Sequence, residues 1–325
     1  MKRRVVLKSF IASAGCAYGF STLAQPVFPN KPVRIVVAVP AGGSIDMVAR
    51  SVAEKLTESL GQPFIVENRA GGAGIIGTDY VAKANPDGYV LTMAPAAWIA
   101  SHVSTFAKLP YDPVRDFTPV IQTVIQPTVL IVNPSSPYTS VAKLVELAKA
   151  SPGKLNYGSG GDGSPHHLFG VMFGQATGAA MTHVAYKGGA PAMVDLLGGQ
   201  IDMIFAPVPE AVAHVKGGKL RALAVMSDTR SSVLPEVPTM SQVGIKGLEL
   251  TTWIGLLAPS GTPRSVVETL NAAVQKALIS GGLGERFAAI GLDTAGGSPE
   301  KFAKAIREDI ASYSRLVKAS GMTPQ

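Results

Sequence analysis

The chain has 325 residues, with 29 Lys and Arg against 22 Asp and Glu, which gives a formal net charge of +7. Four of the basic residues lie in the first 24 positions, so the remainder of the chain is nearly balanced in charge. No cluster of Lys and Arg is interleaved with aromatic residues, and nucleic acid is therefore not indicated as a partner. The length suits about two domains.

The N-terminal end, residues 1–24, has the pattern of a cleaved export signal. A basic start that includes Arg3 and Arg4 precedes an apolar run, which ends at small residues near Ala24. The arginine pair also resembles a twin-arginine signal, so this route and the ordinary secretory route both stay open. The sequence before Cys16 lacks the leading leucine of a lipoprotein signal. We therefore expect a soluble periplasmic protein that has lost its one cysteine.

Strand-like runs alternate with helical patterns after the signal, which is typical of an α/β fold with mostly parallel strands. In the first block, the expected strands and helices alternate over residues 33–39, 44–60, 64–67, 73–84 and 89–94. The second block repeats this alternation over residues 129–132, 140–150, 154–158, 165–177, 182–186, 191–197, 201–205, 209–215 and 220–225. Two more helical patterns follow, at residues 263–280 and 299–319.

Two extended segments, residues 120–128 and 248–258, are expected to cross between the blocks. The last two helices need a sheet to cover, and the first block lacks such cover. We therefore predict a discontinuous first domain, residues 25–125 plus 250–325, with residues 126–249 inserted as the second. Two crossings between two lobes form a hinge, and the cleft between the lobes is the expected ligand site.

A Pro-Ala-Gly-Gly turn between the first expected strand and helix is a candidate anion site. Gly42 and Gly43 let the backbone approach a ligand, and the first amides of the next helix point outward without intrahelical partners. Ser44 is expected to cap these amides. Asp46 is expected either to contact the ligand or, as the favoured role, to serve the helix start. The predicted ligand-binding residues of this loop are Pro40, Ala41, Gly42, Gly43, Ser44 and Asp46.

Two more glycine-rich loops follow expected strands in the second block. Ser164 is the expected N-cap of the helix after the first of them, and Pro165 suits its first turn. Three loops of this kind, at strand ends in two lobes, predict an anion clamp. The predicted ligand-binding residues are Gly160, Gly161, Asp162, Gly163, Ser164, His167, Lys187, Gly188, Gly189 and Ala190, with Ala94 at a strand end of the first block.

Other kinds of chemistry lack parts that they need. Two G-x-G-x-x-G matches, at residues 72–77 and 158–163, are not followed by an acidic residue placed to bind ribose. The histidines lack metal-ligand spacing, and no serine has G-x-S-x-G surroundings. We predict no catalytic residue, cofactor or metal. Trp98 and Trp253 are expected in the core, with a place in the cleft wall as the alternative for Trp98.

Motifs along nearly the whole mature chain resemble the Bug-type (TctC-like) solute-binding receptors of tripartite tricarboxylate transporters. They are PAGGSID at 40–46, VENRAGGAGIIG at 66–77, NPDGYVL at 85–91, YDPVRDFTPV at 111–120, LNYGSGGDGSPHHL at 155–168, HVAYKGGAPAMVDLLGGQID at 183–202 and LPEVPT at 234–239. The resemblance implies a two-lobed periplasmic-binding-protein fold of the Venus-flytrap, type II-like kind. It also implies a non-enzymatic receptor for a small carboxylate, such as an organic acid, a dicarboxylate or an amino acid.

The resemblance further implies membrane transporter subunits as partners, and we expect the receptor to be a monomer. Carried onto this chain, it assigns one carboxylate of the ligand to residues 40–44, partly through water, and a second polar group to residues 160–164 and 187–190. The family commonly has a proline and an aromatic residue where this chain has Ala38 and Val39. A ligand preference that depends on an aromatic wall is therefore not carried over. Delivery of the ligand to a sensor, and an exported hydrolase on a similar fold, are the alternative functions.

Overall fold

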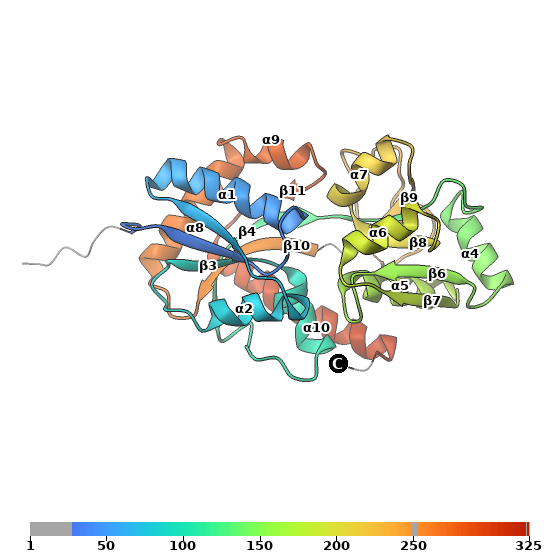
Figure 1. Ribbon diagram of the computed structural model, residues 1–325, viewed down its shortest axis with the longest axis horizontal. Coiled ribbons are helices and arrows are strands. Elements are labelled where there is room, and N and C mark those ends of the chain that lie inside the picture. The colour runs from blue at the N-terminus through green and yellow to red at the C-terminus, as the bar shows by residue number, and fades with distance from the viewer. Residues whose placement is uncertain (1–27, 249–251, 323, 325) are drawn as a thin grey trace, which may run out of the picture.

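Two α/β lobes lie side by side along the long axis of the molecule, each a β-sheet covered by helices (Figure 1). The computed structural model describes residues 28–248, 252–322 and residue 324. The expected export signal lies outside these residues. Among the described helices, none combines the length and the apolar character needed to cross a bilayer. The predicted fold class, α/β with two lobes, is confirmed.

The sheet of the first lobe has six strands in the order β11-β4-β10-β3-β1-β2. β1 lies parallel to β2 and β3, whereas β10 lies antiparallel to β3 and β4. The strands are β1 (Val33–Val37), β2 (Phe64–Asn68), β3 (Val90–Pro95), β4 (Phe117–Gln126), β10 (Thr252–Pro259) and β11 (Asp293–Thr294). The helices are α1 (Ser44–Leu60), η1 (Gly72–Gly74), α2 (Ile75–Ala82), η2 (Ala97–Ser101), α3 (His102–Thr105), α8 (Arg264–Ile279), α9 (Leu283–Ala288) and α10 (Pro299–Ser320).

The sheet of the second lobe has five strands in the order β7-β6-β8-β5-β9. β6 lies parallel to β7 and β8, and β5 lies antiparallel to β8 and β9. The strands are β5 (Thr128–Val132), β6 (Leu155–Ser159), β7 (Met181–Ala185), β8 (Met203–Pro207) and β9 (Arg221–Val225). The helices are α4 (Val141–Ala150), α5 (Pro165–Thr177), α6 (Gly189–Leu197) and α7 (Val208–Lys216).

Burial of apolar strands and of one face of each helix holds these layers together. Every residue of β5 and β8 is buried, as expected for interior strands of a covered sheet. On α1, Val48, Val52 and Leu56 recur at helical spacing and pack into the same core as β1. Burying each of these side chains contributes roughly 1.5–3 kcal/mol. α1 ends at Gly61, which adopts the left-handed conformation that glycine favours there.

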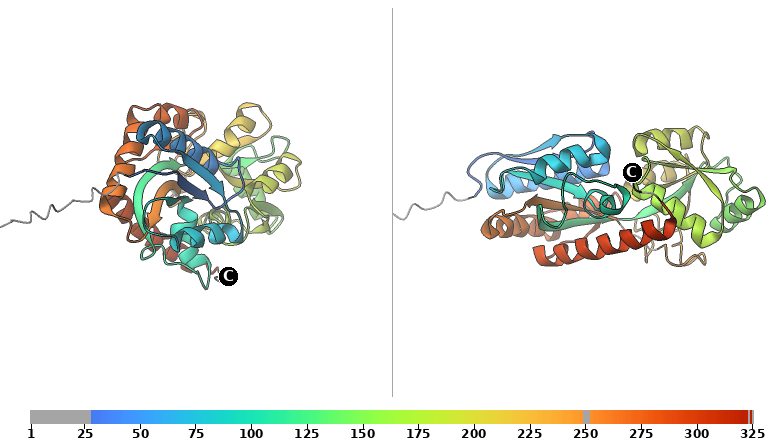
Figure 2. Two further views of the ribbon diagram at one scale, coloured as in Figure 1. Left: turned by 60° about the vertical axis from the view of Figure 1, so that its left-hand side comes forward. Right: turned by 90° about the horizontal axis from the view of Figure 1, so that it is seen from below.

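The chain crosses between the lobes where β4 runs into β5 through Pro127, and it returns before β10. α10 adds a further connection, because it begins on the first lobe and reaches along the second (Figure 2). Its Tyr313 and Val317 belong to the same hydrophobic core as Phe169 and Phe173 of α5. The sequence predicted this helix but not its second contact, since an apolar stripe does not reveal which lobe it will face.

Several boundaries differ from the sequence-based expectations. β1 ends at Val37 rather than residue 39, because the chain turns there into the first glycine loop. The extended segment before residue 258 does more than cross between lobes, since it forms β10 in the middle of the first sheet. The π-helix η2 directly after β3 was not predicted. A single π-helical turn has no hydrophobic period of its own by which a sequence could reveal it.

Candidate functional site

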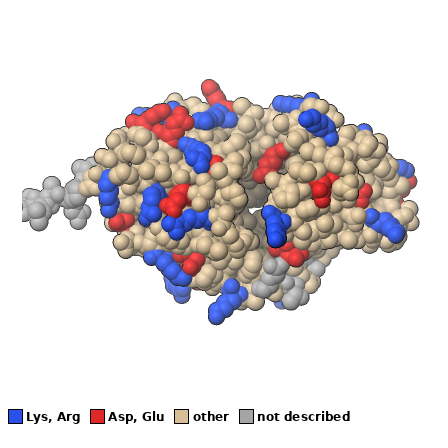
Figure 3. Space-filling view, viewed as in Figure 1, with Lys and Arg blue, Asp and Glu red and all other residues tan. Residues whose placement is uncertain are grey.

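The carboxyl ends of the parallel strands in the two lobes meet across a cleft. β1 leads into the first glycine loop, β6 and β7 end in loops of the second lobe, and β8 runs directly into α7. Ser44 and Glu210 approach each other from different lobes, with 3.5 Å between Ser44 Oγ and Glu210 Oε1. The surface is hollowed between the lobes (Figure 3). An α/β fold of two lobes typically binds its ligand in such a place.

The loop after β1 leaves open space beside two glycines. Gly42 has a φ of 100°, and Gly43 is extended with φ −81° and ψ 174°. A Cβ atom on either residue would meet no other atom within 4 Å. Gly43 is the N-cap of α1, so no side chain caps the first amides of this helix. The loop therefore has open space beside its glycines, next to the uncapped start of α1, where N–H groups favour an anion.

The prediction that Ser44 caps α1 is wrong. Gly43 is the N-cap, Ser44 is the first residue of the helix, and no side chain makes a capping hydrogen bond there. Ser44 Oγ instead accepts a hydrogen bond of 2.7 Å from Nε2 of Gln126, the last residue of β4. The hydroxyl group thus links the first loop to the crossing between the lobes.

Asp46 holds the first loop in place. Its carboxylate accepts hydrogen bonds from the Gly42 N–H (3.0 Å), Arg50 Nε (2.9 Å) and Asn68 Nδ2 (2.9 Å). Asn68 Nδ2 also donates to the carbonyl oxygen of Val39. Burial raises the pKa of Asp46, but these hydrogen bonds together lower it by more. The pKa therefore lies below its usual value. Of the two roles considered for Asp46, these contacts support the one at the helix start.

The two predicted loops of the second lobe lie against each other. A Cβ atom on Gly160 would lie 3.5 Å from the backbone nitrogen of Gly189. Gly188 is the N-cap of α6, and no side chain caps this helix. Ser164 caps α5 as predicted, because its Oγ accepts a hydrogen bond from the backbone N–H of His167. The second lobe therefore also presents an uncapped helix start to the cleft.

Glu210 is a cleft residue that the sequence did not predict. It lies in the first turn of α7, with Oε1 facing Ser44 and Oε2 3.5 Å from the position that a Cβ on Gly189 would take. Burial raises the pKa of Glu210, and the hydrogen bond from Ser44 lowers it by less. One signal was available in the sequence: Glu210 follows an expected strand at the same sheet edge as the glycine loops.

A small cavity of about 10 Å³ lies where the second-lobe loops meet Glu210. Gly160, Gly189 and His166 line it together with Glu210. His166 was not predicted as a site residue, whereas the predicted His167 stacks on His183 instead. The cavity has room for about one water molecule, so a ligand needs the cleft to widen here.

The other predicted residues are spread between the surface and the core. Pro40, Ala41, Lys187 and Ala190 are exposed, and Ala94 is buried in the core behind the first loop. The side chains of Trp98 and Trp253 are also buried in the core, which is the first of the two placements considered for Trp98.

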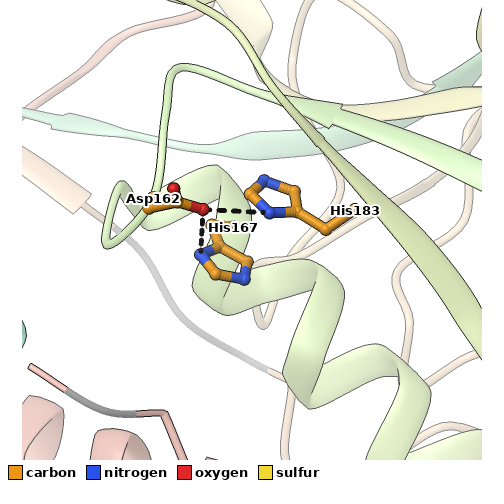
Figure 4. Close-up of side chains that lie close together, drawn as sticks. All are labelled: Asp162, His167 and His183. Carbon is orange, nitrogen blue, oxygen red and sulfur yellow. Dashed lines mark ion pairs between the residues drawn. The ribbon is translucent and has the colours of Figure 1, made fainter.

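A network of side chains braces the glycine loop after β6 (Figure 4). His183 Nδ1 lies 3.3 Å from Asp162 Oδ1, and His183 Nε2 lies 2.7 Å from Ser159 Oγ. Ser159 Oγ also accepts a hydrogen bond from the N–H of Gly161. The ring of His167 stacks on His183, with ring centroids 3.7 Å apart and planes at 5°. Burial lowers the pKa of His167 to about 4 and also lowers that of His183, so both rings are neutral at pH 7.

The ligand atoms of Asp162, His167 and His183 all lie within 4.8 Å of one another, a spacing that a metal ion could bridge. The lone pairs of an imidazole lie in the plane of its ring, so two parallel stacked rings cannot both point at one ion. In addition, His167 Nδ1 already accepts a hydrogen bond of 3.2 Å from the N–H of Gly163. The geometry fits a hydrogen-bonded brace for the loop better than a metal site.

Residues 48–322, which extend from α1 to α10 through both lobes, match the model of one protein family, the tripartite tricarboxylate transporter family receptor TctC. The chain belongs to this family. A relative, protein BugT of Bordetella pertussis, is 37% identical over 317 residues, which cover 97% of this chain and 96% of the relative.

Solved structures extend the likeness to the arrangement of both lobes. An R. palustris protein with adipate is 36% identical and has a TM-score of 0.88. The match covers 92% of this chain and 100% of that protein's chain. MatC from Rhodopseudomonas palustris with bound malate is 31% identical and has a TM-score of 0.82. The match covers 89% of this chain and 100% of the MatC chain. The TctC fold of this chain is thus supported by both sequence and structure.

Proposed function

We propose that this TctC-family receptor captures a small carboxylate in the cleft between its lobes and delivers it to the membrane subunits of a transporter. One observation carries the proposal: uncapped helix starts, preceded by glycine loops, reach one cleft from both lobes, at α1 and at α6. Free N–H groups and the positive end of the helix dipole both favour an anion. The adipate and malate bound to two related proteins are carboxylates.

In this account the open space beside Gly42 and Gly43 receives one carboxylate of the ligand. The amides of the first turn of α1 donate hydrogen bonds to it, directly or through water. The loops at residues 160–164 and 187–190 contact the other end of the ligand. Contacts from both lobes favour the closed arrangement by the difference in binding free energy between the closed and the open form.

We infer the domain division from the two sheets. Residues 25–125 plus 250–325 form one domain, because β1 to β4, β10 and β11 share a sheet, and residues 126–249 contain all strands of the other sheet. We also infer that residues 1–24 direct the chain to the periplasm, by the twin-arginine or the secretory route. Sequencing the N-terminus of the native protein would test this, with a start near Gln25 as the expected result.

The hydrolase alternative gains one observation, since Ser159, His183 and Asp162 are connected in the order of a catalytic triad. In a catalytic triad the serine faces the substrate and the acid is buried. Here the exposure of the serine and the acid is the other way round. Ser159 is fully buried and its Oγ is engaged with Gly161, whereas the side chain of Asp162 is 56% exposed. Because the Ser159 hydroxyl group is held by Gly161 and His183, we infer that the protein binds its ligand without converting it.

Calorimetric titration of the mature protein with mono-, di- and tricarboxylates tests the proposal. We expect one ligand per chain, and we expect mass spectrometry to recover that ligand unchanged after long incubation. If no carboxylate binds, the proposed function is wrong. If the bound compound is consumed, the hydrolase alternative replaces it.

A further inference from the structure

An acidic side chain stands inside a cleft whose loops are suited to anions. The carboxylate of Glu210 lies between Ser44 at the start of α1 and Gly189 at the start of α6. It therefore lies close to both of the uncapped helix starts that carry the proposed function. Any ligand that bridges these helix starts must approach the Glu210 carboxylate.

No cation balances this carboxylate within the described part of the chain. No Lys, Arg or His there forms an ion pair with Glu210, although Asp46 in the first turn of α1 is paired with Arg50. The hydrogen bond from Ser44 is long, at 3.5 Å. Burial raises the pKa of Glu210, which means that the free protein holds its charged form at a cost.

The position of Glu210 at a helix start explains only part of this arrangement. An acid in the first turn of α7 interacts favourably with the helix dipole, and it does so also when it faces solvent. The dipole therefore does not account for a half-buried carboxylate that faces Ser44 of the other lobe and lines a cavity with Gly160. A partner of opposite charge, brought by the ligand, would compensate for the burial.

We propose that Glu210 is a subsite for a cationic nitrogen, and that the ligand of this receptor is an amino carboxylate rather than a dicarboxylate. The inference rests on the proposed function, because the amides at α1 take the carboxylate end of the ligand. The ammonium end then lies beside Glu210 and forms charge-assisted hydrogen bonds with it. A second carboxylate in the same place would be repelled by Glu210.

Pairs of ligands with equal numbers of methylene groups test this selectivity by calorimetry at pH 7. The pairs are 3-aminopropanoate and succinate, 4-aminobutanoate and glutarate, and 5-aminopentanoate and adipate. For the pair with the best length, we expect the parent protein to bind the amino carboxylate at least tenfold more tightly. Glu210→Gln should lose at least tenfold in affinity for that amino carboxylate and should gain affinity for the matching dicarboxylate.

Glu236→Gln is the matched control, because it removes the same charge from an exposed residue outside the cleft. We expect it to keep the ligand preference of the parent. If the parent prefers the dicarboxylate of each pair, or if Glu210→Gln leaves the preference unchanged, the subsite is refuted while carboxylate binding stands. If neither the parent nor Glu210→Gln binds any carboxylate, the proposed function fails together with the subsite.

Discussion

Gly42 and Gly43 stand side by side in the first loop but tolerate substitution differently. The positive φ of Gly42 is a conformation that residues with a side chain rarely adopt, so any substitution there strains the backbone. Gly43 has an extended conformation that any residue can adopt. Among the glycines of the described residues, it alone combines an ordinary φ with no atom within 4 Å of an added Cβ. A side chain at Gly43 therefore fills the cleft without straining the loop.

We expect Gly43→Val to weaken carboxylate binding at least tenfold, or about 1.4 kcal/mol. The branched side chain would occupy the open space beside Gly43, where we propose that the ligand carboxylate lies. The free energy of unfolding should fall by no more than about 1 kcal/mol, since Val is only a poorer N-cap than Gly. Calorimetry and thermal unfolding measure the two effects separately.

Ala142→Val is the control for this change, because it adds a similar bulk to an exposed position on α4. It should leave the affinity unchanged. A Gly43→Val protein that binds its ligand as tightly as the parent would show that the first loop is not the site.

Asp46 gives a prediction with a defined pH dependence. Asp46→Asn removes the charge from a buried carboxylate that accepts hydrogen bonds from Arg50, Asn68 and the Gly42 N–H, and it should cost about 1–3 kcal/mol of stability at pH 7. Because the pKa of Asp46 is lowered on folding, this contribution is present above its usual pKa and is lost as the pH falls through the lowered value.

Urea unfolding at pH 7 and at pH 3 measures this difference between Asp46→Asn and the parent. We expect the difference to shrink at the lower pH. Glu58→Gln removes a more exposed acid from the same helix, where its ion pair with Lys55 should contribute little. An equal loss of stability in both variants would contradict the role assigned to Asp46.

At the residue scale, the sequence predicted what depends on local backbone chemistry. The glycines of the first loop and the N-cap at Ser164 follow from turn and capping preferences of neighbouring residues. Glu210 and Gln126 were missed, because their approach to Ser44 joins segments far apart in the chain. No local pattern records such a contact.

At the scale of elements, the boundaries of α1 and α5 agree with the predicted helices at 44–60 and 165–177. Both helices have clear start and stop signals, such as Gly61 and Gly178 in left-handed conformation. Pairing of β10 between β3 and β4 could not be predicted, since it joins residues more than a hundred positions apart. The second contact of α10 was missed for the same reason.

Two substitutions at Tyr313 test whether α10 holds the second lobe. Tyr313 is 2% exposed, and its hydroxyl group has no hydrogen-bond partner among the described residues. Tyr313→Ala should lower the free energy of unfolding by about 3–5 kcal/mol, because it leaves a cavity between α10 and the core shared with α5. Tyr313→Phe keeps the ring and removes an unsatisfied polar group, so we expect no loss.

Urea denaturation of the parent and the two Tyr313 variants measures the change in the free energy of unfolding for each substitution. A small effect of Tyr313→Ala would mean that α10 contributes little to the shared core. A large loss for Tyr313→Phe would show that the hydroxyl group has a partner after all.

At the scale of the whole molecule, the cleft is assembled from segments that only the tertiary fold brings together. The loop after β1, the end of β4, the loops after β6 and β7 and the start of α7 all contribute to it. Alternation of strands and helices predicted two lobes, and the positions of glycine loops at strand ends predicted which edges face the ligand. Composition could not predict the distance between these edges, on which recognition of a particular ligand depends.

Small-angle X-ray scattering tests most directly whether a carboxylate is captured between the lobes. We expect the radius of gyration to decrease when the protein is saturated with a carboxylate that calorimetry has shown to bind, because contacts from both lobes favour the closed form. Gly43→Val should need at least tenfold more ligand than the parent to reach the same decrease in radius. An unchanged radius and scattering curve with the ligand bound one to one would contradict capture by closure of the lobes.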